Sequence, residues 1–400
     1  MIDFTLSETQ QQFVTAIRGF GREVLAPAEA ELDKIADPNA VYESDLFWNV
    51  MNQAFDLGIH KMSFREDHGG LALDPLTTGM VWEELARHGV GFAASLMAGS
   101  VVPALIAFLA PGNKKLVDRY VRPFCEKDNA KMISAWGSSE PDVGSDGKNY
   151  DDLSVHHRTT AVKRGDKYII NGTKSSFVSN GGIADSFVIF ACIDSAKGLR
   201  GSGAFVIPAD APGVIRGKAV DRLGLRTLNQ APVYFEDVEV SEDHLIFAPS
   251  PGYPMLHNAI VTVGNLGTGY LGLGVMRAAY EQALQYAKER VQWGEPIIKH
   301  QLVAKKLFDA HAAIESTRAL LWKGSWCCSK SFPGDLKTSL TAKILTTNLA
   351  AKHTAELAQV LGGYGLTKDY PIEKHQRDAP LLRVMDGTND TLMIKAAALL

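Results

Sequence analysis

The sequence predicts an α+β protein in which a helical region, a β-rich region and a second helical region follow one another. Apolar residues recur at helical spacing up to about residue 130, β-branched residues and turn dipeptides fill the segment 131–245, and long helical patterns then return. A chain of 400 residues exceeds what one hydrophobic core usually organises. We therefore expect an all-α domain at 1–130, a β-domain at 131–245 and a helical domain at 246–400.

The first helix has a start signal and a stop signal. Ser7 and Gln10 fit a capping box, and apolar residues then recur at helical spacing from Phe13 to Val24. Pro27 cannot donate a backbone hydrogen bond and is expected to end this helix.

Turn dipeptides and apolar stripes place the later elements. Residues 167–170 lie between Gly165-Asp166 and Asn171-Gly172, which indicates a hairpin strand closed by a turn on each side. Further strands are expected at 186–193, 204–207 and 233–240. Two helices joined by a loop at 332–335 are predicted by apolar stripes at Val303, Leu307, Ile314 and Leu321, and at Leu336, Leu340 and Ile344.

Bulk properties exclude several classes of function. A formal net charge of −4 gives no electrostatic reason to expect nucleic acid or an anionic membrane as a partner. The uncharged segment 89–113 approaches the length of a membrane span, but Pro103 and Pro111 interrupt it, which favours buried helices. The N-terminus lacks a secretory signal and the four cysteines lack zinc-ligand spacing, so we expect reduced thiols and a cytoplasmic protein.

Three segments could contact a dinucleotide cofactor, although the chain has no Rossmann fingerprint and no Walker loop. The Gly- and Ser-rich segment 136–146 can offer backbone N–H groups to a polar ring edge, or it is a plain surface loop. In the segment 290–301, Arg290 can hold a pyrophosphate and Trp293 can cover a ring, or the segment is an interhelical turn. Glycines at 359–365 let a phosphate approach the backbone, or they cap a helix.

These three segments, in this order and spacing, resemble the acyl-CoA dehydrogenase family. The resemblance runs from about residue 4 to residue 395, beginning with the motif at Phe4 and including the segment 83–87. It implies an N-terminal helical domain, a β-barrel-like middle domain and a C-terminal four-helix bundle that enclose FAD. It also implies a cofactor site shared by two-fold-related subunits of a homotetramer, an acyl-CoA substrate, and an electron-transfer flavoprotein as partner.

The resemblance also implies which residues contact the cofactor. Positions bordering the flavin are matched by Trp136, Ser138, Ser139, Ser145, Phe177 and Ser179. The segment before Phe177 is one residue longer than in typical members. Positions that reach FAD across the subunit interface are matched by Arg290, Gln292, Trp293, Gln359, Gly362 and Gly363. Thr388 and Asp390 are expected near the same cofactor.

Asp386 occupies the position immediately before Gly-Thr, where most members carry a glutamate. That carboxylate removes a proton from the carbon next to the thioester carbonyl, and here it is about 1.5 Å shorter in reach. Asp386 is either the working base of a variant enzyme or the remnant of a base that moved or was lost. Some members carry the base on a central helix, which aligns with residues 261–267 and contains no acid here.

The same helix departs from the family in two ways. Thr262 and Asn265 occupy positions where members acting on CoA thioesters usually carry an Asp and an Arg that help to hold acyl-CoA. Its glycines either permit close helix packing or widen the substrate cavity; they are Gly264, Gly267, Gly269, Gly272 and Gly274.

The leading hypothesis is FAD-dependent α,β-desaturation of an acyl-CoA with a cyclic or branched acyl group, and with electrons passed to an electron-transfer flavoprotein. A second hypothesis is a flavin oxidase resembling nitroalkane oxidase with Asp386 as its base, which the lost charges at Thr262 and Asn265 favour. A third is an idle subunit, against which the retained carboxylate argues. Oxygen as terminal acceptor would distinguish the second hypothesis from the first.

Overall fold

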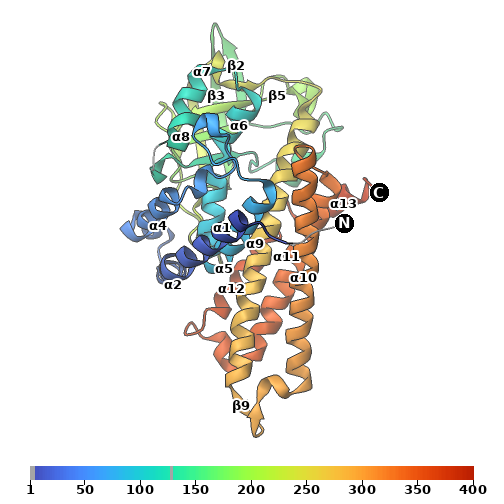
Figure 1. Ribbon diagram of the computed structural model, residues 1–400. Coiled ribbons are helices and arrows are strands. Elements are labelled where there is room, and N and C mark those ends of the chain that lie inside the picture. Colours follow the sequence, from blue (N-terminus) through green and yellow to red (C-terminus); the bar gives the residue numbers. More distant parts are fainter. Residues whose placement is uncertain (1–4, 127–128) are drawn as a thin grey trace.

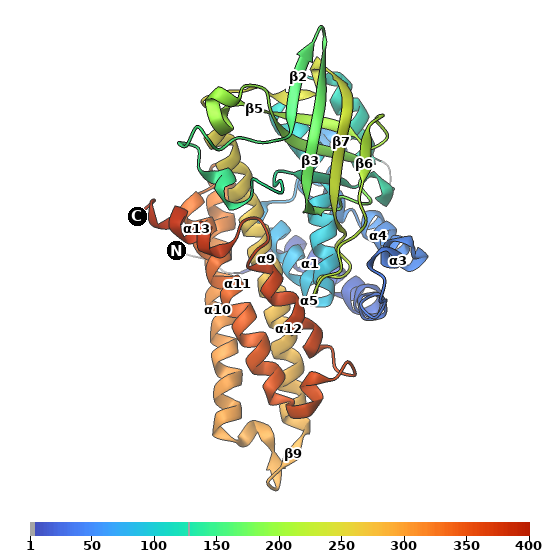
Figure 2. The same cartoon turned by 180° about the vertical axis from the view of Figure 1, so that it is seen from behind.

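The computed structural model describes residues 5–126 and 129–400, so Phe4 of the opening motif lies outside the described residues. A helical part, a sheet and a long helical bundle follow one another along the chain, which confirms the predicted α+β class (Figure 1). The bundle extends away from the sheet, and the N-terminal helices pack beside its upper half (Figures 1 and 2).

Helices alone build the N-terminal part. The predicted capping box is present, since the Ser7 backbone N–H donates to Gln10 Oε1 at 2.9 Å. Pro27 does not end the helical path, contrary to the prediction: a π-helical stretch, Gly21–Leu25, leads into the next helix, and proline is tolerated in a first helical turn. The helices are α1 Glu8–Phe20, α2 Ala26–Leu32, α3 Pro38–Glu43, α4 Asp45–Asp56, α5 Pro75–Gly99, α6 Val101–Leu109, α7 Lys114–Leu116 and α8 Arg122–Glu126, with a second π-helical stretch at Val117–Val121.

The middle part is one eight-stranded sheet. Its strand order is β6-β7-β3-β2-β4-β5-β8, with β1 parallel to β4. The predicted hairpin at Gly165-Asp166 is present, but Asn171-Gly172 does not close it, because β3 continues through a bulge there. Gly172 has φ 145°, and a Cβ on it would lie 2.5 Å from the Thr159 Cα, so the strand needs glycine at this point. The strands are β1 Ser134–Gly137, β2 Thr160–Arg164, β3 Lys167–Ser179, β4 Ser186–Cys192, β5 Ser202–Pro208, β6 Val214–Arg216, β7 Gln230–Ser241 and β8 Leu245–Phe247.

A second bulge in β3 turns Phe177 outwards. Lys174 pairs with Val233 and Val178 pairs with Ala231, so three residues of β3 face a single residue of β7. The Phe177 side chain in this bulge is 65% exposed.

The C-terminal part is a bundle of three long helices followed by two short ones. Its central helix, α9, packs on both α5 and α11, and 78% of its most apolar stretch is buried. α9 and the α5–α6 segment are long and apolar enough to span a membrane, and burial in the core accounts for this composition. The helices are α9 Tyr253–Glu289, α10 Gln301–Lys330, α11 Leu336–Val360, α12 Ile372–Leu382 and α13 Asn389–Ala397.

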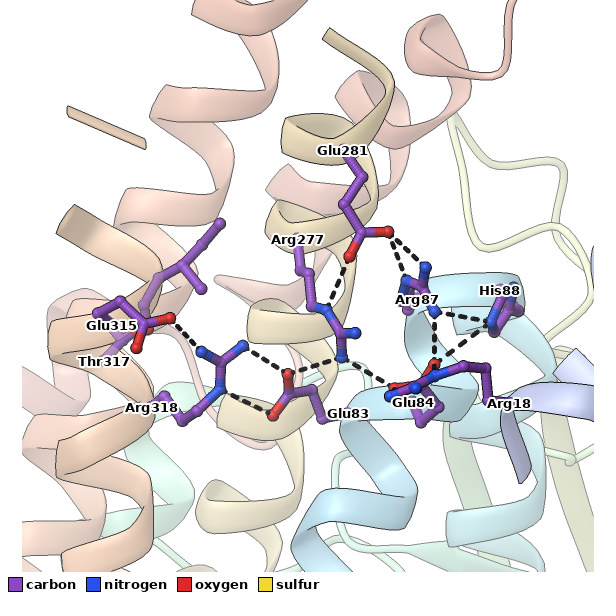
Figure 3. A network of polar contacts seen from close by, with 11 residues as sticks. Arg18, Glu83, Glu84, Arg87, His88, Arg277, Glu281, Glu315, Thr317 and Arg318 are labelled. Atoms are coloured by element: carbon purple, nitrogen blue, oxygen red, sulfur yellow. Dashed lines mark hydrogen bonds and ion pairs between the residues drawn. The ribbon is translucent and has the colours of Figure 1, made fainter. Parts of the chain in front are cut away.

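A network of buried charges joins α5 to α9 and α10 (Figure 3). Arg277 of α9 contacts Glu84 at 2.8 Å and Glu83 at 3.2 Å, and Arg318 of α10 contacts Glu83 at 2.9 Å. Burial acts to raise the pKa of Glu84, but hydrogen bonds from His88 and Arg18 and the charges of the arginines hold it below its usual value. The network therefore fixes α9 against the N-terminal part.

Candidate active site

The Asp386 carboxylate faces the middle of α9. Asp386 lies between α12 and α13 at φ 53°, and its Oδ2 accepts a hydrogen bond from Thr268 Oγ1 at 2.9 Å. A Cβ built on Gly264 would lie 2.9 Å from the same oxygen, closer than side-chain carbon normally approaches. Gly264 therefore gives the carboxylate the room it occupies.

Asp386 sits in a loop that is anchored on both sides by a buried lysine. Lys343 of α11 has no exposed side-chain surface, and its Nζ donates to the Gly387 carbonyl at 2.8 Å, the Arg383 carbonyl at 3.2 Å and Asn389 Oδ1 at 2.7 Å. Burial lowers the pKa of Lys343 to about 7 despite the attraction of Asp386. These bonds hold the backbone before and after Asp386, so the left-handed conformation of this residue is maintained.

The loop after β1 is also rigidly held. The buried Glu140 carboxylate accepts from Lys174 Nζ at 2.6 Å and from the Thr159 backbone N–H at 3.1 Å. Just before this loop, Trp136 lies 6.4 Å, centroid to centroid, from His257 of α9. Within the described residues, the buried Trp136 Nε1 has no hydrogen-bond partner. Trp136 thus presents a ring and a free donor beside α9.

The segment after this loop crosses the start of α9 and meets α13. Tyr150 Oη lies 2.8 Å from His257 Nδ1, and Lys395 Nζ of α13 donates to the same hydroxyl at 3.3 Å. On the same segment, Lys148 extends to the residue after the base, because a Cβ on Gly387 would lie 1.9 Å from Lys148 Nζ. Lys148 thus lies close to the base.

The residues expected beside the flavin ring differ in how far they are buried. Trp136 and Ser138 are half-buried, whereas Ser139 and Ser145 are exposed on the loop that follows β1. The Ser179 hydroxyl lies 3.3 Å from its donor Gln230 Nε2, next to the exposed Phe177. Thr388 is half-buried at the start of α13, and Asp390, two residues further on, is exposed.

The second group of predicted residues lies at the opposite end of the bundle. The segment 290–301 forms a two-stranded hairpin, β9 Val291–Gln292 and β10 Glu295–Pro296, rather than a simple interhelical turn (Figure 1). Its tip residues Trp293 and Gly294 have φ 55° and 84°, as a tight hairpin requires, and Trp293 is 95% exposed. The exposed members of this group are Arg290, Gln292, Trp293, Gln359, Gly362 and Gly363. The hairpin tip at β9 lies far from the sheet and from α13 within one chain (Figures 1 and 2).

The residues of both groups fit parts of a flavin dinucleotide. A flat ring with polar edges would match the unpartnered Trp136 Nε1 and the exposed Phe177 ring. A pyrophosphate would match the Arg290 guanidinium and the open backbone at Gly362 and Gly363, where an added Cβ would meet nothing within 4 Å.

The structure also assigns roles that the sequence pattern did not. Thr268 and Gly264 contact the Asp386 carboxylate, and Lys343 anchors its loop. The sequence could have indicated that Lys343 is buried, since this residue lies on the apolar stripe that continues from Leu340 along α11. A lysine on such a stripe is buried only when oxygen atoms surround its ammonium.

The glycines of α9 serve mostly for packing. A Cβ would approach within 2.5 Å of Met97 at Gly267, within 2.5 Å of Leu321 at Gly269, and within 2.4 Å of the Glu83 carbonyl at Gly274. Close helix packing therefore explains the glycines at these three positions. Gly264 differs from them, because it faces the carboxylate of Asp386.

Comparisons with known proteins agree with this architecture. Three family models match in succession: the N-terminal domain of acyl-CoA dehydrogenase at 7–128, its middle domain at 135–238 and its C-terminal domain at 254–400. The chain is 31% identical over 406 residues to a short-chain specific acyl-CoA dehydrogenase of Megasphaera elsdenii, with 100% of both chains covered. It is 30% identical over 397 residues to cyclohex-1-ene-1-carbonyl-CoA dehydrogenase of Syntrophus aciditrophicus, covering 99% of this chain and 91% of the relative. The structure of butyryl-CoA dehydrogenase from Megasphaera elsdenii superposes with a TM-score of 0.88 at 30% identity, with both chains fully covered.

Proposed function

Because the chain belongs to the acyl-CoA dehydrogenase family, whose members are FAD-dependent oxidoreductases acting on CH–CH groups, we propose that it desaturates a short-chain or cyclic acyl-CoA with Asp386 as the base. The acyl group is proposed from the relatives named short-chain specific and cyclohex-1-ene-1-carbonyl-CoA dehydrogenase. The observation that supports the base is the fixed carboxylate of Asp386 opposite Gly264, since the facing stretch of α9 carries no acid.

Bound FAD supplies the hydride acceptor of this reaction. The protein's own task is to remove the proton from the carbon next to the thioester carbonyl. Thr268 donates to Asp386 Oδ2, and no hydrogen bond to Oδ1 is found within the described chain, so Oδ1 is the oxygen proposed to take the proton. Lys343 holds the loop in place during proton transfer, because it is bonded to the carbonyls on both sides of the base.

We also propose that the cofactor site is completed by a second copy of this chain within a homotetramer. The hairpin that carries Arg290 and Trp293 lies at the far tip of the bundle, away from α13 and the sheet, so we propose that it serves a neighbouring subunit. An electron-transfer flavoprotein is the proposed electron acceptor. A solved structure described as the electron transferring flavoprotein of Acidaminococcus fermentans contains a chain that is 30% identical, with a TM-score of 0.89 over the whole of both chains.

An anaerobic titration of the FAD-loaded protein tests the proposal. Flavin absorbance is followed while butyryl-CoA, cyclic acyl-CoAs and long straight-chain acyl-CoAs are added. Bleaching by a short or cyclic acyl-CoA, with slow reoxidation in air, is the expected result. A flavin that none of these thioesters bleaches would refute it.

A flavin oxidase resembling nitroalkane oxidase is the second candidate, and the uncharged residues on α9 favour it. Thr262 is buried and donates to the Asn258 carbonyl, while Asn265 donates to the Val261 carbonyl at 2.8 Å, so neither offers a charge to a CoA thioester. The structure of nitroalkane oxidase with 1-nitrooctane has a TM-score of 0.90 at 21% identity, a likeness of fold. Bleaching by nitroalkanes alone, with fast reoxidation by oxygen, would select this candidate.

A further inference from the structure

Two lysines beside the base have no carboxylate of their own. Lys148 Nζ lies against Gly387, and the Lys395 ammonium lies 5.1 Å above the Tyr150 ring while donating to the Tyr150 hydroxyl and to Asn258 Oδ1. Within the described residues, neither ammonium forms an ion pair with a carboxylate. Both side chains are half-buried, so solvent screens their charges only in part.

The charges that face these lysines do not balance. Among the described residues, Asp386 is the one carboxylate that acts on Lys148, and the Lys343 side chain is already bonded to carbonyl oxygens. His257 is neutral at physiological pH, because burial lowers its pKa to about 3. Burial, with the like charge of Lys148, also lowers the pKa of Lys395 to about 8. Within the described residues, Lys148 is therefore opposed by the charge of Asp386 alone and Lys395 by no carboxylate, an arrangement that a bound anion would stabilise.

The position of the two lysines restricts where such an anion can come from. Lys148 is next to the proposed base, and Lys395 is joined through Tyr150 and His257 to Trp136, so the two lysines lie between the base and the residues expected at the flavin ring. By contrast, Arg277 and Arg318 are matched with carboxylates in the network around Glu83 and Glu84 (Figure 3). The unmatched pair thus marks a place for charge that the ligand brings.

We propose that Lys148 and Lys395 bind an anionic group of the substrate, either a carboxylate on the acyl group or a phosphate on its pantetheine arm. This inference rests on the proposed acyl-thioester dehydrogenase function. The two sources share one chemistry, an oxyanion that accepts hydrogen bonds from ammonium groups. Loss of one such bond is expected to weaken binding roughly ten- to hundredfold.

Matched substrates separate the two sources. Glutaryl-CoA against butyryl-CoA tests an acyl carboxylate, and butyryl-4′-phosphopantetheine against butyryl-pantetheine tests a phosphate. KM and kcat are measured for the wild type, Lys148→Met and Lys395→Met, with Lys148→Arg as the charge-retaining variant and exposed Lys34→Met as the control. Flavin content and melting temperature show whether each variant is folded.

The wild type should prefer the charged member of one pair through a lower KM, and both Met variants should lose that preference while kcat changes little. Lys148→Arg and Lys34→Met should keep it. Equal KM values within both pairs for the wild type, or Met variants that weaken charged and uncharged members equally, would overturn the inference. A protein that no thioester reduces would instead refute the proposed dehydrogenase function.

Discussion

Replacing Gly264 by alanine should damage catalysis without damaging the fold. The new Cβ would lie 2.9 Å from Asp386 Oδ2 and 3.4 Å from its Cγ, so the carboxylate must retreat by about 0.5 Å to reach an ordinary contact distance. A misplacement of 1 Å can cost about a hundredfold in rate, so a shift of about half that distance should cost roughly tenfold. Alanine gains up to about 1 kcal/mol in a helix, and a weakened bond from Thr268 to the base costs about 1 kcal/mol, so the free energy of unfolding should change by less than about 1 kcal/mol.

The assay for Gly264→Ala is the rate of anaerobic flavin reduction by a saturating acyl-CoA, combined with urea unfolding. The control is Gly19→Ala on α1, where an added Cβ meets nothing within 4 Å and where only the helix-propensity gain is expected. A wild-type reduction rate in Gly264→Ala would refute the reasoning. So would a rate loss accompanied by loss of flavin or by a destabilisation of several kcal/mol.

Three further predictions follow from individual side chains. Asp386→Asn should keep FAD bound but lose flavin reduction by substrate, and turnover at the wild-type rate would show that the base lies elsewhere. Lys343→Met should lower kcat about tenfold or more with little change in KM, because the loop that carries the base loses its hydrogen bonds; a change in KM alone would contradict this role. His60 is stacked on Phe55 and buried, and burial lowers its pKa to about 3. Between pH 6.5 and 3 the unfolded chain therefore binds up to one more proton than the folded chain, and the free energy of unfolding falls as the pH falls. The substitution His60→Phe removes this pH dependence. In urea unfolding, the free energy of unfolding of the variant relative to wild type should rise by about 2 kcal/mol between pH 6.5 and pH 5. A difference between the two proteins that does not change with pH would contradict this prediction.

Local patterns predicted the order of the elements and part of the site. The capping box at Ser7, the hairpin at Gly165-Asp166 and the strand at 186–193 were predicted from short-range signals that tertiary contacts do not override. The prediction that Pro27 ends the helix was wrong, because a π-helical stretch brings the proline into a first turn, where its missing N–H needs no partner. Asn171-Gly172 was mistaken for a turn because a bulge and a tight turn both use a glycine.

The site could be predicted only where one residue type identifies its chemistry. Asp386 was identified by its sequence context, but its partners Thr268 and Gly264 lie on a helix more than a hundred residues earlier, and nothing local marks them. Lys148 was missed because its significance depends on which ammonium groups it meets in space. Such juxtapositions arise from the packing of α9, α13 and the loop after β1, which no single segment encodes.

The exposed hairpin at the far end of the bundle has a thermodynamic consequence. If Arg290 and Trp293 of one subunit complete the cofactor site of another, the binding of flavin and the association of subunits are thermodynamically coupled: each strengthens the other. Dilution of the protein should then release flavin, and removal of flavin should loosen the assembly by the same factor. Newly made chains would therefore mature together rather than singly, at a rate that rises with their own concentration.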